Sequence, residues 1–214
     1  PYPIHGNGFS ATWTEASRSS DFIALTLSSD GPGPFRYDAM LCYRLEGAGL
    51  VMELSLVNRA ETRLPYGAGF HPWFVRDADT TLTAPSKGVW LEQSDHLPKA
   101  HEPIAKHPDM DFNAPRSLPP RWINNWFDGW DGKARIGWPA RGLQADIEAS
   151  EVLDQYVVFS PAAAADFFCF EPVSHPVDAF NLPDRADAYG LKVLSPGETL
   201  DIWTRIAVSP RKPA

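Results

Sequence analysis

Clusters of positive charge, cysteine pairs and long apolar runs are all missing from this 214-residue sequence. The formal net charge is -8 and no segment is rich in Lys and Arg, which argues against a surface for nucleic acid or for an anionic membrane. The two cysteines, Cys42 and Cys169, form no disulfide framework or C-x-x-C motif, so we expect a reduced, cytoplasmic location. No apolar run approaches the roughly 20 residues that a membrane-spanning helix needs.

Convincing amphipathic helices are also missing, whereas 21 prolines and 15 glycines indicate many turns. Several segments alternate apolar and polar residues with the period of two that is typical of half-buried strands. The predicted strands are 22–27, 37–45, 50–56, 80–84, 143–147, 156–160, 167–170 and 200–208. This pattern predicts an all-β, antiparallel sandwich, with residues 1–214 forming one domain. The segment 92–121 is rich in proline and has little periodicity, so we expect a long functional loop there.

A histidine between two prolines and several aromatics is the first candidate for chemistry, in Leu64-Pro65-Tyr66-Gly67-Ala68-Gly69-Phe70-His71-Pro72-Trp73-Phe74. The glycines permit close backbone approach, and Pro72 restricts His71 to an extended conformation. An isolated His-Pro pair is more often a packed core histidine than a catalytic one. His71 is nevertheless held in a defined direction, as a proton-transfer group must be.

A glutamate after an aromatic strand is the second candidate. Glu171 follows Phe168-Cys169-Phe170, and we expect Pro172 and Pro176 to end the strand and leave the carboxylate at its rim. Apolar surroundings can raise the pKa of a glutamate towards neutrality, which suits a general base. An ordinary exposed glutamate at a strand end is about equally compatible with the segment.

Two further segments combine glycine turns with polar and aromatic side chains. One is His5-Gly6-Asn7-Gly8-Phe9, and the other begins at Asn124 and runs through Asn125, Trp126, Asp128 and Trp130. Each segment alone fits a structural turn. Their composition also suits a sugar, whose C–H faces stack on tryptophan and whose hydroxyls bind Asn, Asp and His. Trp73, Trp126 and Trp130 are the candidates for stacking, although tryptophan more often packs in a core.

Taken together and in this order, these segments resemble the galactose-mutarotase superfamily, and more closely its bacterial aldose 1-epimerases. His5-Gly6 is similar to the His-Gly-Gly element, and the segment from Gly69 to Phe74 to the G-x-H-P-[YW]-F element. Glu171-Pro172, with the residues up to Asn181, is similar to the C-terminal E-P element. The segment Leu194-Ser195-Pro196-Gly197-Glu198 is similar to the L-x-P-G-E turn. The resemblance extends from about residue 4 to about residue 208.

The resemblance implies an antiparallel β-supersandwich with a sugar site on the concave face of a sheet. It makes His71 the general acid, Glu171 the general base, and His5 and Asn124 substrate-binding residues. Well-characterised relatives carry aspartate where this chain has Asn124, so hydrogen bonding to the sugar is expected to differ there. The family also has strands before the His-Gly element, with an arginine that contacts the sugar, so we expect this sequence to be N-terminally incomplete.

The implied reaction interconverts the α and β anomers of an aldohexose such as galactose or glucose. Glu171 would take the O1 proton while protonated His71 gives one to the ring oxygen O5, each contributing about 10²–10⁴-fold. This chemistry requires no metal, nucleotide or redox cofactor. The expected partner is a monosaccharide, with no nucleic acid and no membrane, and the sequence does not set the oligomeric state.

Four alternatives remain open at this stage. A hexose-6-phosphate epimerase would need cations, for which Arg59, Arg63 and Arg76 are candidates, although solvated surface charge explains them better. A sugar-binding domain could keep the fold without turnover. A glycosidase would pair Glu171 with Asp128 or Asp131. A metal site could use His5, His71 and His175, but their spacing matches no standard ligand pattern.

Overall fold

Three antiparallel sheets make up the computed structural model, which describes residues 5–182 and 186–211. The largest sheet contains, in spatial order, β1 (Thr14–Arg18), β2 (Phe22–Ser29), β3 (Tyr37–Glu46), β4 (Gly49–Asn58), β17 (Thr199–Pro210), β13 (Leu143–Ala149), β12 (Lys133–Trp138), β7 (Thr81–Thr83) and β10 (Arg116–Ser117). The second sheet contains β6 (Trp73–Val75), β15 (Phe167–Val173), β14 (Gln155–Ser160), β11 (Ile123–Asp128), β8 (Gly88–Glu92) and β9 (Pro98–Pro103). A small ribbon pairs β16 (Lys192–Leu194) with β5 (Leu64–Tyr66).

The eight predicted strands are confirmed, with ends that differ by a few residues at most. The helices in the described residues are short 3-10 turns: η1 (Ile104–Lys106), η2 (Pro139–Arg141), η3 (Ala179–Asn181) and η4 (Ala186–Tyr189). None of the helices described has the length and apolar character needed to cross a membrane. The segment 92–121 is not the unstructured loop that we expected, because it contains β9, η1 and β10.

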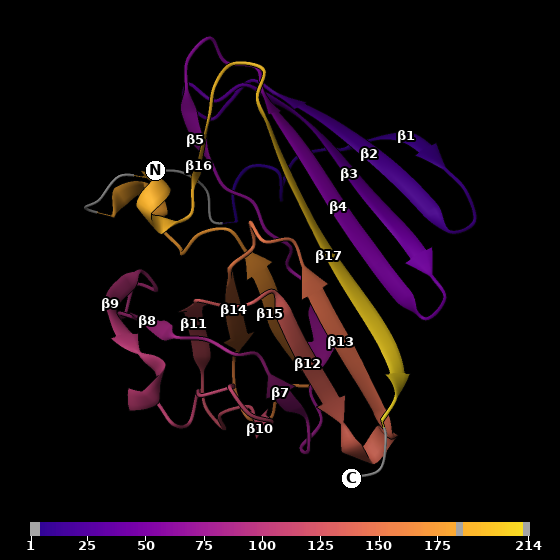
Figure 1. Cartoon of the computed structure of the whole chain (residues 1–214), viewed down its shortest axis with the longest axis vertical. Coiled ribbons are helices and arrows are strands. Elements are labelled where there is room, and N and C mark those ends of the chain that lie inside the picture. Colours follow the sequence, from indigo (N-terminus) through magenta and orange to yellow (C-terminus); the bar gives the residue numbers. More distant parts are fainter. Residues whose placement is uncertain (1–4, 183–185, 212–214) are drawn as a thin grey trace.

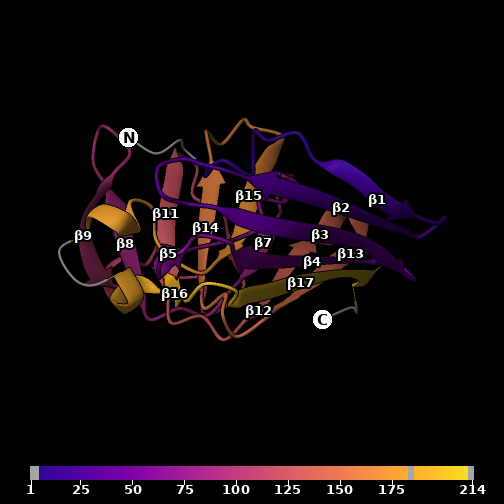
Figure 2. The ribbon, with the colours of Figure 1, turned by 90° about the horizontal axis from the view of Figure 1, so that it is seen from above.

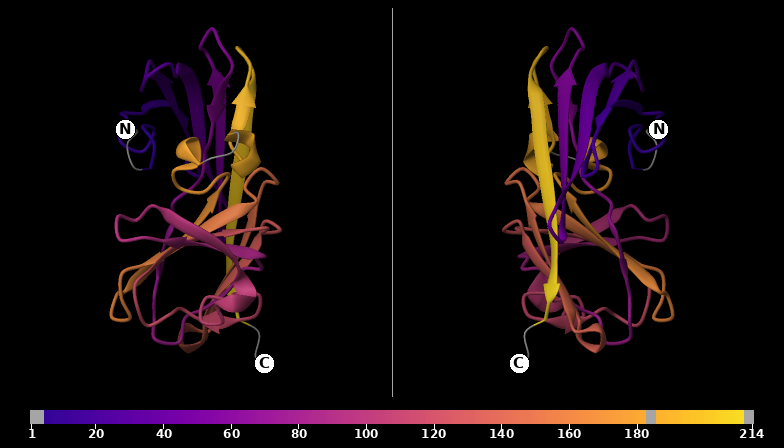
Figure 3. Two further views of the ribbon diagram at one scale, coloured as in Figure 1. Left: turned by 90° about the vertical axis from the view of Figure 1, so that its left-hand side faces the viewer. Right: turned by 90° about the vertical axis from the view of Figure 1, so that its right-hand side faces the viewer.

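The long strand β17 holds the large sheet together. It pairs with β4 over Thr199–Ala207 and with β13 over Thr204–Pro210, so it joins the N-terminal hairpins to the later strands. Figure 1 shows this strand running diagonally between β4 and β13. Seen from above in Figure 2, the strands of the large sheet extend past the six-stranded sheet, and the side views in Figure 3 show the two sheets facing each other in the lower half of the molecule.

The main core lies between one half of the large sheet and the inner face of the six-stranded sheet. Leu82, Ile136 and Ile147 from the first meet Phe168 and Phe170 from the second, and all five are at most 1% exposed. Each such side chain contributes about 1.5–3 kcal/mol by its burial. Because side chains alternate along a strand, the residues between these phenylalanines point to the opposite face of the six-stranded sheet. That opposite face carries the candidate site.

A second core cluster lies under the β5–β16 ribbon. Tyr66, Leu194 and Leu56 are buried there, together with Phe70 at the start of the histidine segment. Buried Asn58 ties the ribbon to β4, because its Nδ2 donates to the Leu194 carbonyl and its Oδ1 accepts from the Tyr66 hydroxyl. The segment that leads to His71 therefore starts from a rigid anchor.

Candidate active site

Backbone contacts between the histidine segment and the end of β15 position His71. Gly69 forms a bridge with Val173, and the Phe70 N–H donates to the Pro172 carbonyl at 3.0 Å. A Cβ on Gly69 would lie 2.8 Å from the Pro172 oxygen and 2.7 Å from the Val173 side chain, closer than real Cβ atoms come. Gly69 is therefore the residue that lets the chain approach β15 and bring His71 over it.

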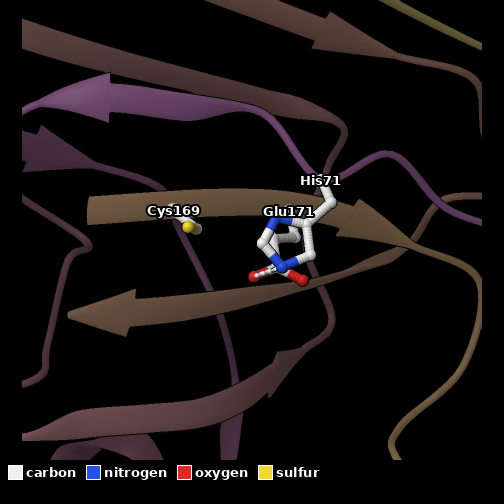
Figure 4. Close-up of side chains that lie close together, drawn as sticks. All are labelled: His71, Cys169 and Glu171. Atoms are coloured by element: carbon white, nitrogen blue, oxygen red, sulfur yellow. Dashed lines mark ion pairs between the residues drawn. The ribbon is translucent and has the colours of Figure 1, made fainter. Parts of the chain in front are cut away.

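His71 and Glu171 are in direct contact. His71 Nε2 lies 3.2 Å from Glu171 Oε1, and Figure 4 shows the imidazole against the carboxylate while Cys169 lies further along β15. Glu171 is only 8% exposed, and His71 Nδ1 is buried with no hydrogen-bond partner among the described residues. The two predicted catalytic residues thus come together in a poorly solvated position.

Burial favours the neutral forms of both residues. It raises the pKa of Glu171 from 4.5 to about 8 and lowers the pKa of His71, which the neighbouring His5 imidazole lowers further. At neutral pH these shifts leave the pair with one proton, on Glu171, whose carboxyl oxygen lies 3.2 Å from the imidazole nitrogen. One acid and one base in contact are the arrangement that general acid–base catalysis requires.

Aromatic rings flank the imidazole of His71. The His5 ring meets it edge-on, with centroids 5.0 Å apart, and also contacts Phe9. On the other side Trp73 stacks on His71 at 6.1 Å and on Phe167 at 4.4 Å. Trp73 is 63% exposed, so its ring is available to an apolar sugar face. His5 therefore lies beside His71 and Glu171.

Asn124 lies on the same face of the sheet but not in contact with the pair. In the strand register it is opposite Phe159, which in turn is opposite Cys169 on β15. Its Nδ2 donates to Glu92 Oε2 at 3.0 Å, and the same carboxylate binds the Trp122 indole N–H and His96 Nδ1. Glu92, which fixes the orientation of Asn124, was not predicted as a site residue, because it lies in the segment that we expected to be irregular.

Several sequence-based expectations need correction. Glu171 is not at the rim, because β15 continues through Pro172 to Val173 and leaves Glu171 inside the strand. Trp130 packs in the main core, and Trp126, although on the site face, is only 4% exposed, so Trp73 is the exposed one of the three proposed stacking rings.

The glycosidase alternative finds no support in the carboxylate positions. Asp128 Oδ2 lies 2.5 Å from His101 Nε2, and Asp131 Oδ1 accepts from the Lys133 N–H in a turn. In the register, Asp128 is opposite Gln155, with β14 between it and the strand of Glu171. Both aspartates that were proposed to pair with Glu171 are therefore engaged by other groups.

The arginines proposed for a phosphate have other partners. Arg59 forms ion pairs with Asp38 at 3.0 Å and Asp30 at 3.4 Å. Arg76 donates to the Ser160 hydroxyl and to the Pro119 carbonyl, and the charge of Arg63 acts on Glu198. Arg59 and Arg76 are therefore already bound to groups of the protein itself.

The described residues bring together a different possible metal-binding group from the predicted one. His71, Cys169 and Glu171 have ligand atoms within 4.8 Å of one another, whereas His175 hydrogen-bonds Ser174 Oγ and packs against Gly67. Burial raises the pKa of the Cys169 thiol to about 12, so it stays protonated at neutral pH. Because a thiol binds metal as its thiolate, these three residues form a weak metal site.

Substituting Gly69 tests how His71 is positioned. Gly69→Ala should separate His71 from Glu171, because the new methyl group pushes the histidine segment away from Pro172 and Val173, and the lowered pKa of His71 should return towards 6.5. The matched control is Gly31→Ala, which meets nothing within 4 Å. The titration of the His71 imidazole, followed by NMR, distinguishes the two variants, with far-UV circular dichroism as a check on folding. Equal pKa values of His71 in both variants would mean that the close approach does not position His71.

Comparison with known proteins agrees with this geometry. Residues 1–207 match the model of the aldose 1-epimerase family. The chain is 36% identical over 203 residues to the uncharacterized protein YphB of Escherichia coli (strain K12), covering 92% of this chain and 68% of YphB.

Solved structures share the fold. A candidate aldose 1-epimerase of Escherichia coli K12 superposes with a TM-score of 0.89 at 32% identity, covering 96% of this chain and 71% of that chain. A galactose mutarotase-like protein of Clostridium acetobutylicum gives a TM-score of 0.83 at 18% identity, covering 97% and 69%. At 18% identity, the likeness to the Clostridium acetobutylicum protein shows the fold alone. This fold is the galactose mutarotase-like sandwich that the sequence predicted. On these grounds the chain belongs to the aldose 1-epimerase family.

Proposed function

We propose that this protein is an aldose 1-epimerase that interconverts the α and β anomers of an aldohexose. The observation that carries the proposal is the buried contact between His71 and Glu171, which share one proton beside His5. A pyranose opens when a base removes the O1 proton and an acid protonates O5, and it closes by the reverse transfers. A pair that holds one proton at neutral pH can serve in both directions.

The proposed roles are Glu171 as the base at O1 and His71 as the acid at O5. In the free protein the proton lies on Glu171, because burial disfavours both charges. Sugar hydroxyls that hydrogen-bond to the carboxylate stabilise its ionised form and so favour transfer of the proton to His71. Substrate binding then sets the pair in the state from which the ring opens. His5 and Asn124 are proposed to bind the sugar hydroxyls.

Polarimetry on freshly dissolved α-D-galactose and α-D-glucose tests this function. We expect the protein to speed the approach to anomeric equilibrium in proportion to its concentration. Glucose 6-phosphate is the comparison substrate, and it should react more slowly because Arg59 and Arg76 are engaged elsewhere. If the two hexoses equilibrate only as fast as they do in buffer alone, the proposal that the protein acts on unphosphorylated hexoses is wrong. Acceleration of the phosphorylated sugar alone would instead favour the hexose-6-phosphate epimerase.

The rate should depend on pH in a way that follows from the shared proton. Above about pH 8 Glu171 loses its proton and the pair has no acid, so the catalysed rate should fall. In acid, below the lowered pKa of His71, both groups are protonated and the pair has no base. Polarimetry between pH 4 and pH 10, after subtraction of the buffer rate, measures this profile. A catalysed rate that keeps rising through pH 9 would contradict it.

A further inference from the structure

His71 and Glu171 occupy opposite positions in one antiparallel register. On one side of them the strands β6 and β15, drawn in Figure 4, pair in this register. On the other side Gly69 forms an antiparallel bridge with Val173, at the position that the same register requires. Residues directly opposite each other in such a ladder have Cβ atoms roughly 4.5–5.5 Å apart, which suits the 3.2 Å contact between imidazole and carboxylate. The register therefore brings the acid and the base together.

Two prolines weaken this ladder next to the acid–base pair. Pro72 follows His71 and Pro172 follows Glu171, and neither proline has an N–H to donate. The Phe70 N–H still donates to the Pro172 carbonyl at 3.0 Å. With donors lost on both strands, the register of the histidine segment depends on contacts further from the pair.

Ser174 closes the ladder at the far end of the histidine segment. Its N–H donates to the Ala68 carbonyl at 3.0 Å, and its Oγ accepts from the Ala68 N–H at 3.1 Å. Ser174 is fully buried, and a Cβ on Gly190 would overlap its carbonyl oxygen, so the backbone is also packed from that side. Ala68 and Ser174 are each three residues from His71 and Glu171, respectively. The two hydrogen bonds therefore fix both chains at the same distance from the pair.

His175 holds the Ser174 hydroxyl group in place. Its Nδ1 lies 3.0 Å from Ser174 Oγ, which is a hydrogen bond in either tautomer of the neutral imidazole. Burial lowers the pKa of His175 to about 4, so the ring is neutral at physiological pH. The ring lies against Gly67, where a Cβ would overlap it and would also lie 2.8 Å from Leu191. The imidazole thus contacts both Ser174 and the start of the histidine segment.

We infer that Ser174 and His175 are positioning residues, which hold the register of the histidine segment on β15 and thereby the contact between His71 and Glu171. The effect on rate rests on the proposed epimerase function, whereas the effect on register does not. Because side chains alternate between the two faces, a slip of one residue would turn His71 away from the site face. Ser174 and His175 therefore set the geometry of proton transfer without taking part in it.

Ser174→Ala tests this role, with Ser160→Ala as the matched control. Both serines are fully buried, and Ser160 Oγ accepts from Arg76 at 2.6 Å and donates to the Phe167 carbonyl at 3.3 Å. Each substitution therefore removes one hydroxyl group and its hydrogen bonds, at opposite ends of β15. Urea denaturation should give similar losses of stability for the two variants. Any difference between them in the histidine segment is then not a consequence of general destabilisation.

The first readout is amide hydrogen exchange followed by NMR, because exchange reports local opening of the backbone. The Phe70 N–H, which donates to Pro172, should exchange at least tenfold faster in Ser174→Ala than in the wild type and in the control. The lowered pKa of His71 should rise towards 6.5 in the same variant, as the imidazole leaves its buried position beside Glu171. Equal exchange of the Phe70 N–H in the two serine variants would overturn the inference.

Two substitutions of His175 keep the test decisive even if Ser174→Ala does not fold. His175→Leu keeps the bulk of the side chain without its hydrogen bond, and Phe70 exchange should again be at least tenfold faster. His175→Asn retains a group that can hydrogen-bond to Ser174 Oγ, so exchange should stay within twofold of the wild type. Equal exchange in the Leu and Asn variants would show that the hydrogen bond does not hold the register.

Polarimetry on α-D-galactose connects the register with the proposed function. Ser174→Ala should lower kcat at least tenfold and change KM less than twofold, because the acid–base pair loses its alignment while Asn124 is still held by Glu92. A change in KM alone would overturn the positioning role. Hydrogen exchange needs no turnover, so a wild-type protein without activity would contradict the epimerase and leave the register to be decided by the Phe70 N–H.

Discussion

Replacing Glu171 with Gln should lower the catalysed rate of hexose anomerisation by about 10²–10⁴-fold. The amide keeps the size of the side chain but neither takes up nor releases a proton. His71→Gln should cost a similar factor, because His71 is the other member of the 3.2 Å pair. The double variant should be little slower than either single variant, since the two residues act as a unit.

The control for this prediction is Glu148→Gln, which changes an exposed glutamate on β13 in the same way. Its rate by polarimetry should equal that of the wild type. If Glu171→Gln retained more than a tenth of the wild-type rate, the base would have to be another group. If the losses in the two single variants multiplied in the double variant, His71 and Glu171 would act independently.

Glu171→Gln should also make the fold more stable at high pH. In the unfolded chain Glu171 ionises near pH 4.5, whereas burial in the folded protein raises its pKa to about 8. The folded state therefore binds this proton more tightly, so wild-type stability falls as the pH rises from 4.5 to about 8. Gln does not ionise and avoids this loss. Each pKa unit corresponds to about 1.36 kcal/mol, so the advantage of the variant should reach a few kcal/mol.

Urea denaturation of both proteins at pH 5, 6.5, 8 and 9 measures this effect. The difference in free energy of unfolding should be small at pH 5 and largest at pH 9. His71 acts in the opposite direction, because its lowered pKa costs stability as the pH falls below its ordinary value of 6.5. The interval from pH 6.5 to pH 8 therefore isolates Glu171. A difference that stayed constant across that interval would show that the carboxyl group is well solvated.

Strands with one exposed face could be predicted from the sequence, and those with two buried faces only in part. In β17, Leu200 and Ile202 alternate with exposed Asp201 and Trp203, so the pattern identifies both the strand and its inner face. In β15 both faces are buried, so the period of two disappears. Pro172 suggested the end of that strand. Pro172 lies beyond Cys169, where the pairing of β15 with β6 ends, and its carbonyl still accepts from the Phe70 N–H on that side.

The candidate site was predictable as far as its residues lie in recognisable segments. His5, His71 and Glu171 could be named in advance, and the structure places them together. Glu92 and His101 could not, because their roles depend on contacts with residues 27 to 32 positions away in the sequence. A glycine at position 88 is the one local sign of the His101–Asp128 pair, and its meaning appears only when the strands are paired.

The alternation along β15 has a practical consequence for engineering. Phe168 and Phe170 point into the core, while Cys169 and Glu171 point to the site face of the same strand. Neighbouring β14 repeats this arrangement, with Tyr156 and Val158 in the core and Val157 opposite Glu171. Randomised libraries for directed evolution can therefore vary the residues of these strands that face the site, with Glu171 itself kept. Such a library samples new sugar preferences while the packed layer beneath it stays as it is.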